Sequence, residues 1–176
     1  VAAVLMYLEF PIPIMPAFVK LDVSELPALI ASFAYGPVSG ILVCLIKNLI
    51  KLPSTSTAAV GELFNFVMGA LFVGVAGLIY KRNKTRKGAI VGALLGALVM
   101  AVVSVPYNYF IVYPAYVVMY HLPLDAIIGM YQAINPNVNG LLACLLVFNL
   151  PFTFVKGALD AVLCFLVYKP LSPILH

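Results

Sequence analysis

Four polar residues near the end of the sequence could bind a polar group inside an apolar environment. Asn149, Thr153, Lys156 and Asp160 are separated by four, three and four residues, so a helix places them along one stripe. An ionisable side chain in an apolar helix is costly, and it normally pairs with another group or faces a cavity. The stripe therefore predicts a cavity, a partner helix, or both. In one alternative Lys156 pairs with Asp160 at i, i+4, which leaves Asn149 and Thr153 for a ligand.

Two more polar groups interrupt earlier apolar segments. Lys47, Asn48 and Lys51 lie near the end of one segment. They either contact a ligand or act structurally, as snorkelling lysines and an asparagine that bonds a neighbouring helix. Glu62 and Asn65 are three residues apart and share a helix face. This pair either contacts a ligand or provides a buried structural link from Glu62 to Lys47.

Aromatic residues surround Asn108 in the segment YNYFIVYPAY. Tyr107, Tyr109, Tyr113 and Tyr116 could stack on a flat ring while Asn108 bonds the edge of that ring. An aromatic belt at the membrane interface is the alternative interpretation.

The sequence contains no pattern that indicates catalysis, a metal site or a bound cofactor. His121 and His176 stand apart, and Cys44, Cys144 and Cys164 lie in apolar segments without CxxC or CxxH spacing. No metal cluster or Cys/His dyad is therefore expected. The glycines form neither a GxxxxGK[ST] loop nor a dinucleotide fingerprint. If this protein drives transport, the energy must come from a partner.

The composition is that of an integral membrane protein. Of 176 residues, 64% are hydrophobic and 9% are charged, whereas soluble domains are about 25% charged. Because the backbone must satisfy its own hydrogen bonds in lipid and no segment alternates as barrel strands do, the long apolar segments are predicted to be helices. We therefore expect an all-α membrane protein in which residues 1–176 form a single transmembrane domain.

Six membrane helices are expected, the first of them only a fragment. Pro11, Pro13 and Pro16 exclude regular helix from residues 9–25, and Ser24 is a suitable N-cap for the next helix. A kink is expected at Pro106. The predicted helices cover residues 1–8, 26–34, 38–51, 58–80, a segment from 88 to about 118, and 141–168, the last divided at Pro151. Small residues at 88, 89, 92, 93, 96 and 97 predict close helix packing.

A basic cluster sets the orientation. Half of the ten Lys and Arg residues lie in residues 81–87, and such residues accumulate in short cytoplasmic loops. This cluster explains the net charge of +4 without a nucleic-acid partner. Both termini are then cytoplasmic in a multi-pass protein of the cell membrane, and residues 9–25, 52–58 and 119–140 face outward.

Several segments resemble one family. The segments FPIPIMPAFVKLDVSELPALIASFAYGPVSG, LIKNLIK, GELFNF, YNYF, PFTFVKG and YKPLSPILH are similar, in this order, to the substrate-binding S components of energy-coupling factor (ECF) transporters. The similarity is to the riboflavin-binding members in particular.

The resemblance implies a six-helix subunit without catalytic activity that captures riboflavin at the outer face. A separate module of one transmembrane coupling subunit and two ATPase subunits would power uptake. Lys156 matches the family lysine in PFNxxKG, whereas Thr153 replaces the asparagine, a contact for which Asn149 could compensate one turn earlier. Asn108, Tyr107 and the backbone at Ala28 and Leu29 are further implied ligand contacts. One alternative is an S component that binds another vitamin. The others are a channel or a membrane-embedded enzyme that uses the charges of Lys156, Asp160 and Glu62.

Overall fold

A computed structural model describes the fold of residues 1–15, 20–55 and 58–175, with side chains described as far as residue 167. Pro16 of the proline-rich segment lies outside these residues. The α-helices are α1 (Ala2–Tyr7), α2 (Glu25–Tyr35), α3 (Pro37–Lys51), α4 (Val60–Arg82), α5 (Arg86–Tyr107), α6 (Tyr113–Tyr120), α7 (Leu124–Gln132), α8 (Leu141–Cys144) and α9 (Leu150–Leu175). The remaining elements are the strands β1 (Phe10–Pro11) and β2 (Lys20–Leu21), the 3₁₀ turn η1 (Leu52–Ser54) and the π-helical turns η2 (Asn108–Val112) and η3 (Leu145–Asn149).

Among the described residues, four helical segments are long and apolar enough to cross a membrane. They cover residues 37–54, 60–82, 86–120 and 141–167. The expected count of six spans is not confirmed, because α1 and α2 have only 6 and 11 residues, whereas a span needs about 20. The bounds of α2 and α3 agree closely with the predicted helices at 26–34 and 38–51.

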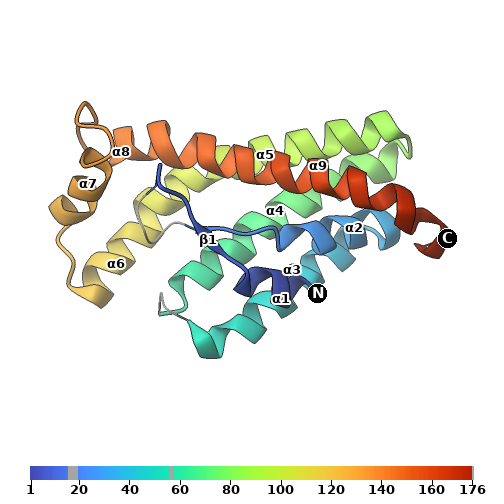
Figure 1. Ribbon diagram of the computed structural model, residues 1–176, viewed down its shortest axis with the longest axis horizontal. Helices are drawn as coiled ribbons and strands as arrows, with labels where there is room; N and C mark the ends of the chain where they lie inside the picture. Colours follow the sequence, from blue (N-terminus) through green and yellow to red (C-terminus); the bar gives the residue numbers. More distant parts are fainter. Residues whose placement is uncertain (16–19, 56–57, 176) are drawn as a thin grey trace.

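The bundle is elongated, and its two ends differ (Figure 1). The turn between α4 and α5 lies at the same end as the C-terminus, and α7 lies at the opposite end. The segment before α2 is not wholly irregular, as β1 pairs antiparallel with β2 in a small hairpin. The connection at 119–140 contains the short helix α7.

Small residues bring α4, α5 and α9 into close contact, as their spacing predicts. A Cβ at Gly96 would lie 2.5 Å from the Phe72 carbonyl oxygen of α4, and one at Gly157 would lie 2.8 Å from Ala97 Cβ. Ala93 and Ala97 are fully buried. At Gly96 and Gly157 the neighbouring helix therefore leaves no space for a larger side chain.

The predicted division of the last helix at Pro151 is wrong. One continuous helical segment covers residues 141–167, and η3 ends two residues before Pro151. In the same way, η2 ends two residues before Pro114 in the long segment from α5 to α6. Because a proline has no N–H to donate into the preceding turn, a wider turn at that place lets the helix continue. The long segment also continues through Pro106.

We expect the two π turns to be the weakest points of these long helices. In amide hydrogen exchange on the protein in nanodiscs, the amides at 108–112 and 145–149 should exchange faster than those at 89–97, where α5 packs against α4. Equal protection of both regions would contradict this expectation.

Candidate ligand-binding site

A cavity of about 140 Å³ lies where α3 ends and α4 begins, beside the end of α5, and so away from the α4–α5 turn that carries the basic cluster. The hairpin contributes Glu9 and Lys20 to its lining, and long helices supply most of the rest. The polar and aromatic lining residues are Glu9, Lys20, Asp22, Glu25, Lys51, Glu62, Phe64, Asn65, Asn108, Tyr113, Tyr116, Asn149, Phe152, Thr153 and Lys156, and Met68, Met100, Val112 and Gly61 complete it. The cavity thus combines an apolar and aromatic wall with many polar and charged groups, several of which are already paired with one another.

The predicted polar stripe of the last helix points into this cavity for three of its four residues. Asn149, Thr153 and Lys156 line it. Asp160 is one turn deeper and 1% exposed, and it is not among the lining residues. The helical spacing therefore predicted correctly that Asn149, Thr153 and Lys156 face a cavity.

Lys156 does not pair with Asp160. Its Nζ lies 3.1 Å from Asp22 Oδ2 and 3.4 Å from Glu25 Oε2. Both oxygens of Asp160 lack a hydrogen-bond donor among the described residues. The i, i+4 alternative fails because two carboxylates at the start of α2 attract the ammonium group toward the cavity.

Lys47 belongs to the same buried network, and it does not snorkel. Its Nζ lies 2.8 Å from Glu25 Oε1 and donates to Ser24 Oγ at 2.5 Å. Ser24 in turn donates from its hydroxyl and, at 2.9 Å, from its backbone N–H to Asp22 Oδ1. Ser24 precedes α2 as predicted, but its side chain does not cap the helix because it bonds these charged groups.

The Asp22 carboxylate is stabilised in its ionised form. Burial acts to raise its pKa, but Lys156 and Lys47 lie close by and Ser24 donates two hydrogen bonds, and together they hold the pKa well below its usual value. Asp22 therefore remains charged at all ordinary pH values.

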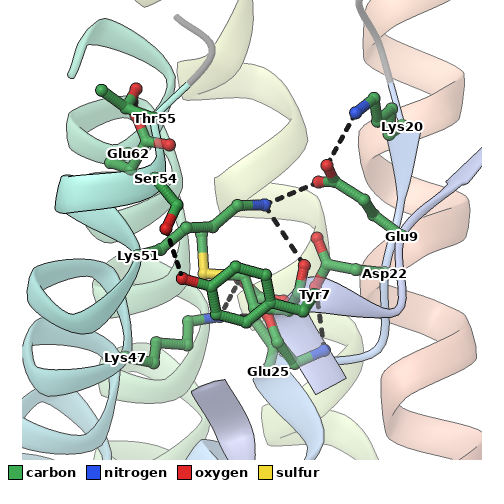
Figure 2. A network of polar contacts seen from close by, with 12 residues as sticks. Tyr7, Glu9, Lys20, Asp22, Glu25, Lys47, Lys51, Ser54, Thr55 and Glu62 are labelled. Carbon is green, nitrogen blue, oxygen red and sulfur yellow. Dashed lines mark hydrogen bonds and ion pairs between the residues drawn. The ribbon is translucent and has the colours of Figure 1, made fainter. Parts of the chain in front are cut away.

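Glu9 joins the hairpin to α3 at the edge of the cavity (Figure 2). Its two oxygens each lie 2.7 Å from a lysine, one from Lys20 and the other from Lys51. Burial acts to raise the Glu9 pKa, but the two lysines outweigh it and lower the value. Lys51 also donates to the Met6 carbonyl at 3.2 Å, so it is an ion-paired residue of the cavity wall and does not snorkel.

The aromatic group around Asn108 divides into two environments. Asn108 lines the cavity and donates from Nδ2 to the Ser104 carbonyl at 2.8 Å, and Tyr113 and Tyr116 line it too. Tyr109 is exposed on the outside of the bundle. Tyr107 is not among the lining residues and packs on Phe64, with 5.7 Å between ring centroids.

Asn149 is fixed by two tyrosines. Its Oδ1 accepts from Tyr131 Oη at 2.8 Å, and its Nδ2 donates to Tyr113 Oη at 3.5 Å. The two tyrosine hydroxyls also bond each other. Asn149 is thus held at the cavity wall by α7 and by the segment that follows η2.

Other predicted residues have mixed outcomes. Glu62 and Asn65 both line the cavity, as their shared helix face predicted. The alternative link from Glu62 to Lys47 is wrong, because Lys47 pairs with Glu25 and Glu62 accepts a hydrogen bond from Thr55 at 2.7 Å. Asn48 donates to Cys44 of its own helix at 2.7 Å, so the predicted bond to a neighbouring helix is wrong. Ala28 and Leu29 are fully buried between α2 and its neighbours and do not line the cavity.

Sequence reasoning missed the acidic partners of Lys156. Asp22 and Glu25 lie within residues 9–25, which the sequence predicted only as an outward-facing connection, yet they are 5% and 2% exposed. Lys156 and Asp22 are separated by 134 positions, so no helical spacing relates them. The available signal was that both acids flank a serine directly before an apolar helix.

Comparison with known proteins identifies the family. Residues 1–168 match the family described as ECF transporter, substrate-specific component. The chain is 34% identical to the riboflavin transporter RibU of Staphylococcus aureus over 172 residues, which are 98% of this chain and 85% of that protein. It is also 34% identical to the riboflavin transporter FmnP of Bacillus subtilis, with 98% and 87% of the two chains covered.

A solved structure supports the same assignment. The S component of a bacterial ECF transporter superimposes with a TM-score of 0.76 at 33% identity, over 99% of this chain and 90% of that one. The four apolar spans are those of a multi-pass membrane protein. The cavity at one end of these spans, the family match and the shared fold agree: this chain belongs to the substrate-specific S components of ECF transporters.

Proposed function

We propose that this protein captures riboflavin from outside the cell and delivers it to an ECF module. That module would consist of a transmembrane coupling subunit and two ATPase subunits, consistent with the lack of a phosphate loop in the sequence. Two relatives that the chain matches over nearly its full length are named riboflavin transporters. The observation that carries the proposal is the convergence of Asn108, Asn149, Thr153 and Lys156 on one cavity.

The cavity suits a flavin in its chemistry. The isoalloxazine ring has a flat apolar body and a polar edge, which require apolar walls and a few donors and acceptors. Phe64, Met68 and Phe152 supply apolar wall. Lys156 and Asn108 supply donors, and the Thr153 hydroxyl can donate or accept.

Ligand binding requires the cavity to widen. Its volume of about 140 Å³ is below the roughly 300–1,000 Å³ of pockets for drug-sized ligands. The ion pairs from Glu9 to Lys20 and Lys51 and from Lys156 to Asp22 join residues that line this small cavity. We infer that riboflavin separates part of this network when it enters.

We further propose that residues 1–176 form one transmembrane domain with both termini in the cytoplasm. In this arrangement α1 and α2 are embedded beside the four spans, which gives six membrane helices. The basic cluster at 81–87 supports the orientation, because it lies at the turn between α4 and α5, away from the cavity. The cavity then faces the outside.

Riboflavin binding at this cavity can be tested with a matched pair of variants. Asn108 and Asn48 are both buried and both donate to the carbonyl four residues earlier, but only Asn108 lines the cavity. Asn108→Ala should weaken binding roughly tenfold, the loss of about one hydrogen bond, and Asn48→Ala should leave affinity unchanged. Quenching of flavin fluorescence measures the affinity of the purified protein.

The orientation of the protein in the membrane is tested in right-side-out vesicles that contain it. Riboflavin added outside should bind, and an excess of biotin, thiamine or folate should not compete. A protein that binds no riboflavin, or from which another vitamin displaces it, would refute the assignment. Binding only from the inside would refute the orientation alone.

A further inference from the structure

The cytoplasmic end of the bundle carries positive charge without any balancing acid. All five basic residues of the cluster, Lys81, Arg82, Lys84, Arg86 and Lys87, are exposed. The ion pairs found in residues 1–15, 20–55 and 58–167 involve none of them. Of the six acidic residues, four line the outer cavity, Asp125 belongs to α7 and Asp160 is buried in α9. This end of the protein therefore attracts anions.

A second cavity lies beside this cluster. It has a volume of about 310 Å³ and is formed where the turn between α2 and α3 meets the last turns of α4. Tyr35, Val38, Tyr80, Lys81 and Lys84 are among its lining residues. The Tyr80 ring packs against Phe33, with 5.0 Å between ring centroids, so one wall is firmly held. Two of the five cluster cations, Lys81 and Lys84, thus line this second cavity, which we call the hollow, and the other three do not.

The same hollow continues into an apolar surface of α3. Val38 is 68% exposed and Leu42, one turn further along α3, is 50% exposed. Tyr35 at the end of α2 is 72% exposed. In a membrane exposed apolar side chains of this kind face lipid, so the hollow brings Lys81 and Lys84 close to a lipid-facing surface. An anion with an apolar tail fits this arrangement, and an anion without a tail uses only half of it.

We propose that this hollow binds the phosphate headgroup of an anionic phospholipid of the cytoplasmic leaflet. Lys81 and Lys84 pair with the phosphate, and an acyl chain lies along Val38 and Leu42. The 15-residue helix α3 begins at Pro37 on the rim of the hollow, so its N-terminal dipole adds to the attraction. Basic pockets between transmembrane helices are known sites for lipid headgroups. The lipid would fix the depth of the α2–α3 turn and of the end of α4.

The test compares two double variants that remove the same charge. Lys81→Gln with Lys84→Gln removes both cations of the hollow, whereas Arg86→Gln with Lys87→Gln removes two cluster cations outside it. Delipidated protein in a neutral detergent is titrated with phosphatidylglycerol or phosphatidylcholine, and bound lipid is counted by native mass spectrometry. We expect the first variant to bind phosphatidylglycerol at least tenfold more weakly and the second to bind it like the unaltered protein.

Each other outcome would overturn the site. Equal losses in both double variants would show diffuse attraction to the whole cluster, and equal binding of phosphatidylcholine would show that charge is not recognised. Displacement of the lipid by an equal concentration of inorganic phosphate would make it a site for free phosphate. Lipid binding unchanged by the first variant, combined with loss of its complex with the ECF module, would assign the hollow to an acidic protein surface.

Folding of the variants is checked independently of lipid. Riboflavin binding at the other end of the bundle should be retained by both double variants, because neither alters a residue of the outer cavity. If the first variant does not fold, Lys81→Arg with Lys84→Arg keeps both charges and should retain the bound lipid. Loss of lipid from that folded variant would also contradict the proposal.

Discussion

Replacing Lys156 with methionine should cost both stability and ligand binding. The change leaves the buried carboxylate of Asp22 without its ion-pair partner and that of Glu25 with Lys47 alone. Removing one partner of a buried ion pair typically lowers the free energy of unfolding by about 3–5 kcal/mol. The apparent Tm in detergent should fall markedly, and riboflavin affinity should fall by tenfold or more if the ammonium donates to the ligand, since such bonds contribute about 1.5–3 kcal/mol.

Two comparisons make the result specific. Lys20→Met breaks an exposed pair with Glu9, whose side chains are 38% and 24% exposed, and exposed pairs contribute only about 0.2–1 kcal/mol. Adding Asp22→Asn to Lys156→Met removes the unpaired charge and should restore most of the stability but not the affinity. If Lys156→Met melts like the unaltered protein, the buried network is not the stabilising feature described above.

Replacing Gly96 with leucine should separate α4 from α5. Even the first added carbon would lie 2.5 Å from the Phe72 carbonyl oxygen and 3.2 Å from the Phe72 ring, and a helix backbone cannot move away as a side chain can. Overpacking costs typically about 1–3 kcal/mol and occasionally more. We expect the upper end of this range despite the roughly 1 kcal/mol that leucine gains over glycine in helix propensity. The apparent Tm and the yield of monodisperse protein report the effect.

Gly129 provides the matched control. It is also helical, in α7, but nothing lies within 4 Å of the position of its missing Cβ. Gly129→Ala should therefore leave the Tm unchanged or raise it by the propensity gain of up to about 1 kcal/mol. A Gly96→Leu protein as stable as Gly129→Ala would mean that the α4–α5 contact is looser than the structure indicates.

The sequence was most informative where one local pattern decides the outcome. Membrane helices follow from apolar length, so α3 was predicted to within one residue and the spans at 60–82 and 86–120 to within about two. The small residues from Gly88 to Ala97 predicted where helices touch, because only such residues allow backbones to approach. The stripe from Asn149 to Lys156 predicted a cavity-facing set because helical spacing alone puts those residues on one face.

Other features depend on distant partners and could not be read locally. The sequence suggested an ion pair between Lys156 and Asp160, one helical turn away, but the partners of Lys156 in the structure are Asp22 and Glu25. Pro151 was expected to end a helix, since the wider turn that accommodates it has no known sequence signature. Tyr131 supports Asn149 from a connection that sequence alone describes only as a loop.

The two π turns predict that the bundle is more easily deformed near the cavity than at the contact between α4 and α5. Both occur beside the outer cavity, where Asn108 and Asn149 belong to them, while the contacts that admit no larger side chain join α4 to α5 at Gly92 and Gly96. The outer half can therefore yield to a ligand larger than the resting cavity while the contacts at Gly92 and Gly96 keep their geometry. Such a division would let the face presented to the energising partner remain constant whether or not the vitamin is loaded.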